Sequence, residues 1–463
     1  MSDFSSLTVG MSGLEANREA LDIVGQNVSN SSTPGYTAER VNQVAVGGVQ
    51  YPGFDESVPP LPGSGVQVTG VSRLTNDYLT ARSLTEQANS GALTAQQNTL
   101  ASIQQIFPEP GTNGIQGQLS SYWSAWGAVA NQPDDSATRT ALLEQGRSLA
   151  TAFNLASSSL GTLSASTASQ VATTVSSINN AATQIAQLNQ SIRQGTLANL
   201  PVNELADQRD QLVSTLSNQL GVTTQTNADG TVDVFTGNQA LVRGITSQSF
   251  TVSGSGTLTS LHWPDGSTFS PTSGQLGGML SSLGTISSYQ SQLDQVALAL
   301  KNQVNAQQAQ GVDLTGAAGV PFFSGTGAGD IAVAVTNPNQ VAAASSSAPV
   351  PVNPTTGLPD PSKNLDGSNA LAAGEMGAQA NGPDVAYRQF ITVLGNAAQQ
   401  ANTQLTAQTS VTASVNAALQ AATGVNVDQE LTNMLMYQHA YEASAKFVTT
   451  VDSMIQTLIG LVQ

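Results

Sequence analysis

The sequence contains no cysteine in 463 residues, which excludes disulfides, thiolate metal sites and cysteine nucleophiles. Its two histidines, His262 and His439, cannot form a histidine-rich metal site or a paired-histidine zinc motif. Lysine occurs only at Lys301, Lys363 and Lys446, and the formal net charge is −17, which argues against binding to nucleic acid or to an anionic membrane face. No stretch approaches the roughly 18 apolar residues that would span a bilayer.

The first residues do not have the pattern of a secretory signal peptide. Asp3 stands where a positive charge is usual, and Gly10, Glu15 and Asn17 interrupt any apolar run. We therefore expect any export to use a route without a cleaved signal peptide.

Matching amphipathic stripes occur at the two ends of the chain, with apolar residues at spacings of three, four and seven. The N-terminal stripe is Leu7, Met11, Leu14, Leu21, Val24 and Val28. The C-terminal stripe is Val427, Leu431, Met434, Tyr441, Val448, Ile455, Leu458 and Val462. Such stripes pack one helix against another. We expect the terminal helices to pair as a coiled coil, and these residues to form an interface for assembly with other chains.

Helical spacing recurs along most of the interior, and the helices are expected over 74–106, after a start at 133–136, over 171–192, over 283–300 and over 390–419. Between 222 and 270 the pattern changes to short Val- and Thr-rich runs separated by Asp-Gly turns, which is typical of strands. The segment 311–382 is rich in Gly, Pro, Ala and Ser and predicts a long loop with one strand near 331–335.

These patterns predict a mainly α protein with a small β domain, an α+β chain whose halves mirror each other about a central insertion. We expect nested domains: a terminal coiled-coil domain (1–45 and 424–463), a mainly helical rod-like domain (46–221 and 276–423, with the loop 311–382) and a small β insertion domain (222–275). Trp123 and Trp126 are expected in the core of the helical domain.

Signals of catalysis are weak. The glycine-rich run from Gly325 to Asp330 resembles a phosphate loop, but no lysine follows it and it opens no amphipathic helix. Asp207 and Asp210 flank Arg209 one turn apart, and we interpret them as a solvated helix face with local ion pairs. We expect no catalytic, cofactor-binding or metal site, and no enzymatic activity.

Short motifs near both ends resemble one family. The N-terminal motif forms a turn after the first helix, because proline fixes φ and glycine accepts a positive φ. Its residues are Asn27, Asn30, Thr33, Pro34, Gly35 and Tyr36. The C-terminal motif opens the last helix, and its residues are Gly424, Asn426, Asp428, Tyr437, Gln438 and Tyr441. Both motifs resemble the flagellar axial proteins, the bacterial family of rod, hook and hook-associated proteins.

Three interior runs, 65–73, 207–213 and 305–314, resemble the hook-associated members of that family, in the right order along the chain. The resemblance implies a structural subunit that forms the junction between hook and filament and self-assembles into a ring through its terminal helices. The implied partners are further copies of the chain, hook protein on one side, hook-associated protein 3 on the other, and a cytosolic export chaperone that holds the C-terminal segment. It also implies export through the flagellar type III apparatus to the extracellular flagellum, without membrane insertion.

Two alternatives stay open. The first is another axial protein, either hook-associated protein 3 or hook protein, although hook protein is mainly β beyond its ends. The second is a secreted adhesin that uses residues 222–270 as its contact surface.

The energetics of the ends suggest a hypothesis about assembly. Ordering about 80 terminal residues costs roughly 1–2 kcal/mol each in backbone entropy. Burying about 14 stripe residues contributes only about 1.5–3 kcal/mol apiece. We therefore expect residues 1–45 and 425–463 to be mobile in the free chain and to fold as neighbouring subunits cover them.

Overall fold

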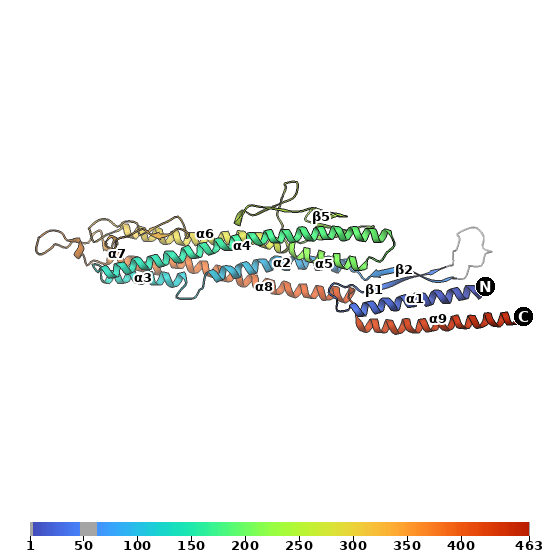
Figure 1. Cartoon of the computed structure of the whole chain (residues 1–463). Helices are drawn as coiled ribbons and strands as arrows, with labels where there is room; N and C mark the ends of the chain where they lie inside the picture. Colours follow the sequence, from blue (N-terminus) through green and yellow to red (C-terminus); the bar gives the residue numbers. More distant parts are fainter. Residues whose placement is uncertain (1–2, 47–62, 463) are drawn as a thin grey trace. The chain divides into compact units, whose positions relative to one another are not determined.

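The computed structural model describes residues 3–46 and 63–462, and helices dominate these ranges (Figure 1). The α-helices are α1 (Asp3–Asn30), α2 (Asp77–Ile106), α3 (Ile115–Asn131), α4 (Ser136–Leu197), α5 (Asn203–Leu220), α6 (Gly274–Ala309), α7 (Ser368–Gly374), α8 (Pro383–Thr423) and α9 (Val427–Val462). Small sheets and short 3₁₀ turns make up the rest of the regular structure. The expected fold class, mainly α with a small β part, is confirmed.

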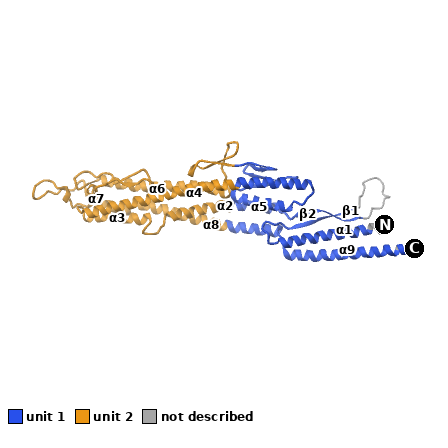
Figure 2. Cartoon of the chain, viewed as in Figure 1, with its two compact units in different colours: residues 1–89, 178–249, 408–463 blue, residues 90–177, 250–407 orange. Residues whose placement is uncertain are grey.

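The chain forms two compact units, coloured separately in Figure 2. Unit 1 contains residues 1–89, 178–249 and 408–463, and unit 2 contains residues 90–177 and 250–407. Each unit combines segments from both halves of the chain, as the mirrored order of elements predicts. The finer division into terminal, rod-like and insertion domains stays a prediction.

Unit 1 holds two sheets. Strands β1 (Glu39–Val46) and β2 (Gly65–Arg73) form an antiparallel pair in which Glu39 lies opposite Arg73. A four-stranded antiparallel meander follows α5 and consists of β3 (Thr223–Thr226), β4 (Val232–Thr236), β5 (Gln239–Arg243) and β6 (Thr246–Ser247). The part of the first hairpin between Val46 and Gly63 lies outside the described residues.

Unit 2 contains three smaller sheets. Strands β7 (Thr251–Ser253), β8 (Ser260–His262) and β9 (Thr268–Phe269) form one sheet. The other two pair β10 (Gly311–Val312) with β13 (Ala344–Ser345), and β11 (Phe323–Ser324) with β12 (Ala332–Val333). The expected strands between 222 and 270 are thus present, with β3 to β6 in unit 1 and β7 to β9 in unit 2.

The core of unit 2 is built around aromatic side chains, since Tyr122 and Trp126 of α3 pack against Phe322 and Phe323 with ring centroids 5.6–5.7 Å apart. Trp123 is also buried, so the expectation for both tryptophans of α3 is confirmed. Edge-to-face and tilted contacts of this kind stabilise a core beyond the area that they bury.

The predictions for one helical region and for one loop need correction. The start near residue 136 and the heptad at 171–192 belong to one helix of 62 residues, α4, whose first turn is capped by Asp135 through the backbone N–H of Thr138 at 3.0 Å. The expected loop 311–382 is more structured than its composition suggests. It contains α7, three short 3₁₀ turns and the strands β10 to β13, because its alanines pack into the core of unit 2.

Candidate functional site

The terminal helices α1 and α9 pack against each other in unit 1 (Figure 1). A β carbon built on Gly10 would stand 2.7 Å from Cγ2 of Val448, so the backbone of α1 runs very close to α9 there. At the other end of α1, Asn27 contacts Glu430 near the start of α9. The start of α1 therefore lies beside the later part of α9, and the end of α1 lies beside the start of α9, so the two helices are antiparallel. The expected pairing of the terminal helices is confirmed.

Asn27 is fully buried, and every hydrogen-bonding position of its amide is used. Its Nδ2 donates to the carbonyl of Glu39 at 2.9 Å and to Oε2 of Glu430 at 3.2 Å. Its Oδ1 accepts from the hydroxyl of Tyr36 and from the backbone N–H of Glu39, both at 2.9 Å. An amide has two donors and two acceptor lone pairs, so Asn27 is saturated.

Glu430 brings a carboxylate into the same buried space, since its side chain is only 1% exposed. Its Oε1 lies 2.5 Å from Nη2 of Arg40 on β1. The helix that carries it begins with a cap, because Oδ1 of Asn426 accepts from the backbone N–H groups of Asp428 and Gln429 at 3.1 and 3.2 Å. The C-terminal motif thus fixes where α9 starts, and with it the position of Glu430.

Tyr36 and Glu39 complete the environment of Asn27. Burial raises the pKa of the Tyr36 hydroxyl to about 12, with a further contribution from nearby carboxylates. The hydroxyl therefore stays protonated and can donate to Asn27. Burial also raises the pKa of the Glu39 carboxyl.

A second layer of charges comes from α5 and β2. Asp207 accepts from Nη1 of Arg73 at 2.6 Å and from the backbone N–H of Thr37 at 3.1 Å. Nη2 of Arg73 also lies 2.9 Å from Asp210. Arg209 is buried and donates to the carbonyl of Gly230 at 2.9 Å. The interpretation of this helix face as solvated is wrong for Asp207 and Arg209. The turn after α1 and the end of β2 cover Asp207, and Arg209 reaches the turn before β4.

We call this network the polar junction; its members are Asn27, Tyr36, Glu39, Arg40, Arg73, Asp207, Asp210 and Glu430. It brings together both terminal motifs and two of the three interior runs singled out in the sequence. Its charged groups form ion pairs with one another and the amide of Asn27 is saturated, so its chemistry is that of a structural joint. Sequence reasoning found the motifs separately but not their convergence. The one feature of the sequence that could have indicated this convergence is that polar side chains recur in separated motifs to which no chemistry could be assigned.

The remaining motif residues shape the turn and the start of α9. Thr33 donates to Oδ1 of Asn30 at 3.2 Å, the carbonyl of Thr33 accepts from the backbone N–H of Tyr36, and Gly35 has a φ of 81°. Pro34, Asp428, Gln438 and Tyr441 are exposed, whereas Gly424 and Tyr437 are half-buried.

The predicted assembly stripe is only partly covered by the chain itself. Val24 is buried; Leu7, Leu14, Leu21, Val28, Met434, Val448 and Ile455 are half-buried; Met11, Val427, Leu431 and Tyr441 are exposed. The side chains of Leu458 and Val462 lie outside the described part. Sequence reasoning missed further exposed apolar residues of α9: Leu435, Met436, Phe447, Met454 and Ile459. The role of the stripe in assembly stays a prediction.

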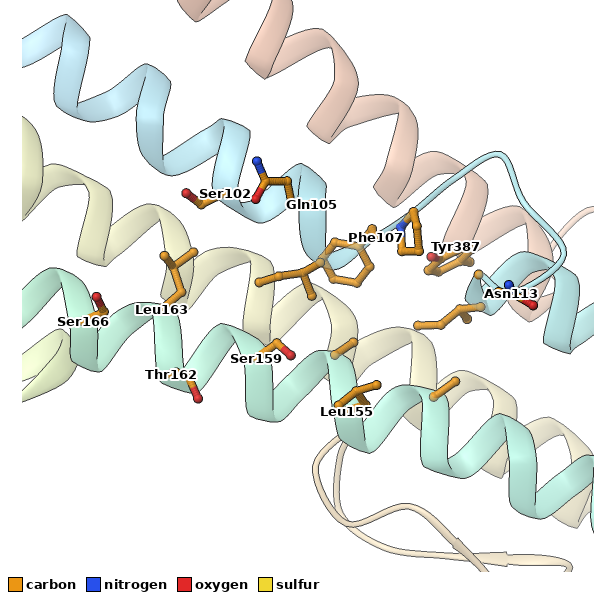
Figure 3. A pocket seen from close by; sticks show the side chains of 16 residues that line it. Ser102, Gln105, Phe107, Asn113, Leu155, Ser159, Thr162, Leu163, Ser166 and Tyr387 are labelled. Carbon is orange, nitrogen blue, oxygen red and sulfur yellow. The ribbon is translucent and has the colours of Figure 1, made fainter.

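Unit 2 contains a cavity of about 590 Å³ (Figure 3). It lies between the end of α2, the start of α3, the middle of α4 and the start of α8. Its walls are Ser102, Gln105, Ile106, Phe107, Pro108, Asn113, Gly114, Ile115, Ala152, Leu155, Ala156, Ser159, Thr162, Leu163, Ser166 and Tyr387. None of these side chains is an acid, a histidine, a lysine or an arginine, so the walls carry no charged group.

Among residues 3–46 and 63–462, no group of three or more acidic or histidine side chains could hold a metal ion. No helix within those ranges is long and apolar enough to cross a membrane.

The chain matches three family models. Residues 7–37 match the flagella basal body rod protein family, residues 419–461 match the C-terminal region of the flagellar basal body rod FlgEFG proteins, and residues 100–323 match the helical domain of the flagellar hook-associated protein FlgK. Flagellar hook-associated protein 1 of Bacillus subtilis is 27% identical over 99% of this chain and 98% of its own length. That of Escherichia coli is 25% identical over 99% of this chain and all of its own length. These matches together support FlgK.

Other relatives agree with this assignment. The FlgK-family protein of Salmonella typhimurium is 29% identical over 69% of this chain and 59% of its own length. A solved structure, that of the flagellar hook junction protein FlgK from Burkholderia pseudomallei, superposes with a TM-score of 0.63 at 19% identity and covers 74% of this chain and all of its own. That structure supports the fold. The resemblance found in the sequence is confirmed, and the other axial proteins and the adhesin are not favoured.

Proposed function

We propose that this FlgK-family chain is a structural subunit of the bacterial flagellum that forms the junction between hook and filament and assembles with further copies through α1 and α9. The similarity to the FlgK family supports the location at the junction between hook and filament. The observation that carries the mode of assembly is the apolar surface of α9, where large side chains between Val427 and Ile459 remain about 40–60% exposed. Covering a large apolar side chain contributes about 1.5–3 kcal/mol. A single helix that exposes so many large apolar side chains favours association.

The partners follow from the family and from this surface. A ring of identical subunits covers α9 with neighbouring copies, hook protein lies on one side of the ring, and hook-associated protein 3 lies on the other. Before export, the same apolar helix needs a cover in the cytosol, which suits an export chaperone at the C-terminal segment. The extracellular flagellum is the destination, and the flagellar type III apparatus is the route.

A non-enzymatic role agrees with the chemistry of the described residues. The groups of the polar junction are engaged with one another through ion pairs and hydrogen bonds, and the cavity of unit 2 has no charged side chain in its walls. The relatives are named flagellar hook-associated protein 1, a name that gives no enzymatic activity.

The experiment is a gene deletion followed by complementation. Deletion is expected to give cells with intact hooks and no filaments, with filament protein released into the medium. The parent gene restores filaments. A variant with Leu435→Glu and Met454→Glu, two exposed apolar positions on α9, is expected to be stable as a free chain and to fail in complementation. Ser453→Glu is the matched control, because it adds a charge at an exposed polar position next to Met454.

The outcomes separate the two parts of the proposal. Normal filaments after deletion would contradict the role at the junction. Hooks without filaments, together with full rescue by the double variant, would leave that role intact and contradict α9 as the assembly surface.

A further inference from the structure

The apolar contact between α1 and α9 does not define a unique alignment by itself. Among the described residues of α1, the buried apolar positions are Gly10, Ala16, Ala20, Ile23 and Val24, and only the last two are large. The half-buried Gly13 lies against Ser444 of α9. Small side chains allow two backbones to approach closely but offer few large knobs that would resist sliding. A shift of one helical turn, about 5.4 Å, would replace one small residue by another at much of the contact.

The polar junction responds differently to such a shift. Glu430 is paired with Arg40 at 2.5 Å and with Asn27 at 3.2 Å, and its side chain is 1% exposed. Movement of α9 by one turn would carry the carboxylate out of reach of both partners. A buried charge without partners is strongly unfavourable, and the Nδ2 donor of Asn27 would lose its bond to Glu430 at the same time.

Neither partner can follow such a shift. Arg40 lies on β1, which is paired with β2 along its length. Asn27 is held by two further bonds to the backbone of Glu39. Only one alignment of α9 therefore satisfies the carboxylate.

We propose that Asn27, Arg40 and Glu430 form a register latch, which sets the antiparallel alignment of α1 and α9 within a single chain. On this proposal the motif residues Asn27 and Tyr36 act inside the subunit and leave the exposed face of α9 for neighbouring copies. The latch is a property of the folded single chain and does not depend on the role of the protein at the junction. A single buried polar residue fixes register in other helix pairs, at a cost in stability.

The absence of native cysteine makes the test direct, because any disulfide that forms must join the two introduced cysteines. A β carbon on Gly13 would lie 3.8 Å from Cβ of Ser444, which is about the mean Cβ to Cβ distance of a disulfide. The in-register reporter is Gly13→Cys with Ser444→Cys. The shifted reporter is Gly13→Cys with Val448→Cys, one turn further along α9. Both are oxidised as the dilute full-length chain, and intramolecular bonds are scored on non-reducing gels.

The parent background is expected to favour the in-register bond strongly. In the N27L/E430L background, which keeps the contact apolar and the helices paired, the ratio of in-register to shifted bond should fall by about tenfold or more. E430Q removes only the charge and should give a smaller fall. E442Q is the matched control, because Glu442 is an exposed glutamate on the same helix, and it should leave the ratio unchanged.

Three results would overturn the latch. One is that the two cysteine reporters in the parent background form only intermolecular disulfides. Another is an unchanged ratio in N27L/E430L with helix content preserved by circular dichroism. If N27L/E430L fails to fold, an E430Q ratio equal to that of E442Q decides against the latch.

Discussion

Nδ2 of Asn27 lies 3.2 Å from Oε2 of Glu430, although the two residues stand 403 positions apart in the chain. This contact closes the longest loop that the polar junction contains. Contacts of such sequence separation form late, because the loop entropy must be overcome before the contact contributes any stability. Unit 1 is therefore complete only when the last helix has returned to the first.

The ion pair between Arg73 and Asp207 should contribute more to stability than ion pairs on the surface. We expect Asp207→Ala to lower the free energy of opening of unit 1 by about 3 kcal/mol, the lower end of the range for breaking a buried pair, because Asp210 still neighbours Arg73. Native-state hydrogen exchange of the α5 amides measures this opening.

Glu144→Ala provides the comparison for Asp207→Ala. Glu144 pairs with Arg147 on the exposed face of α4, and its side chain is 61% exposed. Its removal should change the opening of its own helix by less than about 1 kcal/mol. Equal effects of the two substitutions would show that the junction is no more important for stability than the surface pair.

How far the sequence predicts the fold depends on the size of the residues involved. The long helices and the β region were predictable, since their periodicity comes from large apolar side chains such as Ile178 and Leu293. The face of α1 that meets α9 was not, because hydrophobic periodicity weighs large residues, whereas close helix contact here uses Gly10 and Gly13. The larger residues predicted to form the seam, such as Met11 and Leu431, remain exposed instead.

The polar junction could not be predicted from sequence for a different reason. Asn27, Arg73, Asp207 and Glu430 lie in four segments, and each has an ordinary local interpretation as a turn, a strand end or a helix face. Their convergence depends on the return of α5 and α9 to the turn after α1, which no local pattern encodes. The energetic estimate that predicted mobile ends counted only apolar stripes and omitted this network. Hydrogen exchange of the free chain would show how much protection the network adds at residues 20–40.

The core of unit 2 offers a matched pair of leucines on α4. Leu149 is fully buried, whereas Leu155 is 67% exposed at the rim of the cavity. We expect Leu149→Ala to destabilise unit 2 by about 2–5 kcal/mol, because it leaves a cavity among packed side chains. Leu155→Ala should change stability by no more than about 0.5 kcal/mol. Urea unfolding followed by tryptophan fluorescence measures both, because Trp123, Trp126 and Trp263 all lie in unit 2. Similar midpoints would contradict the packing described for α4.

Asp384 should make the stability of unit 2 depend on pH. Its carboxylate is buried and accepts from Nε1 of Trp123 at 2.6 Å and from Nε2 of Gln116 at 3.0 Å, and burial raises its pKa. A carboxyl whose pKa is higher in the folded state binds more protons when folded. Its contribution to stability is therefore greatest below its unfolded pKa of about 3.9 and declines as the pH rises through the folded value.

We expect Asp384→Asn to remove this decline, so that the stability of the variant relative to the parent improves between about pH 4 and neutrality. Thermal unfolding of both chains across this range measures the effect. Asp265→Asn is the control, since that side chain is exposed and hydrogen bonds lower its pKa. A constant difference between Asp384→Asn and the parent at all pH values would show that the carboxyl does not titrate differently on folding.

Gly278 and Gly284 lie on the same helix, α6, and should respond in opposite directions to alanine. A β carbon on Gly278 would stand 2.4 Å from the carbonyl oxygen of Ala92 and 2.9 Å from its Cα, so α2 and α6 are in backbone contact at this point. Because backbone atoms cannot rotate away, Gly278→Ala must separate the helices, and we expect a loss of about 1–3 kcal/mol in stability.

Gly284 is exposed, and a β carbon there meets nothing within 4 Å. Gly284→Ala should therefore stabilise the helix by about 0.5–1 kcal/mol, through the lower backbone entropy of alanine in the unfolded chain. Melting temperatures of the two variants against the parent measure the difference, and a stabilising Gly278→Ala would mean that α2 and α6 do not approach each other this closely.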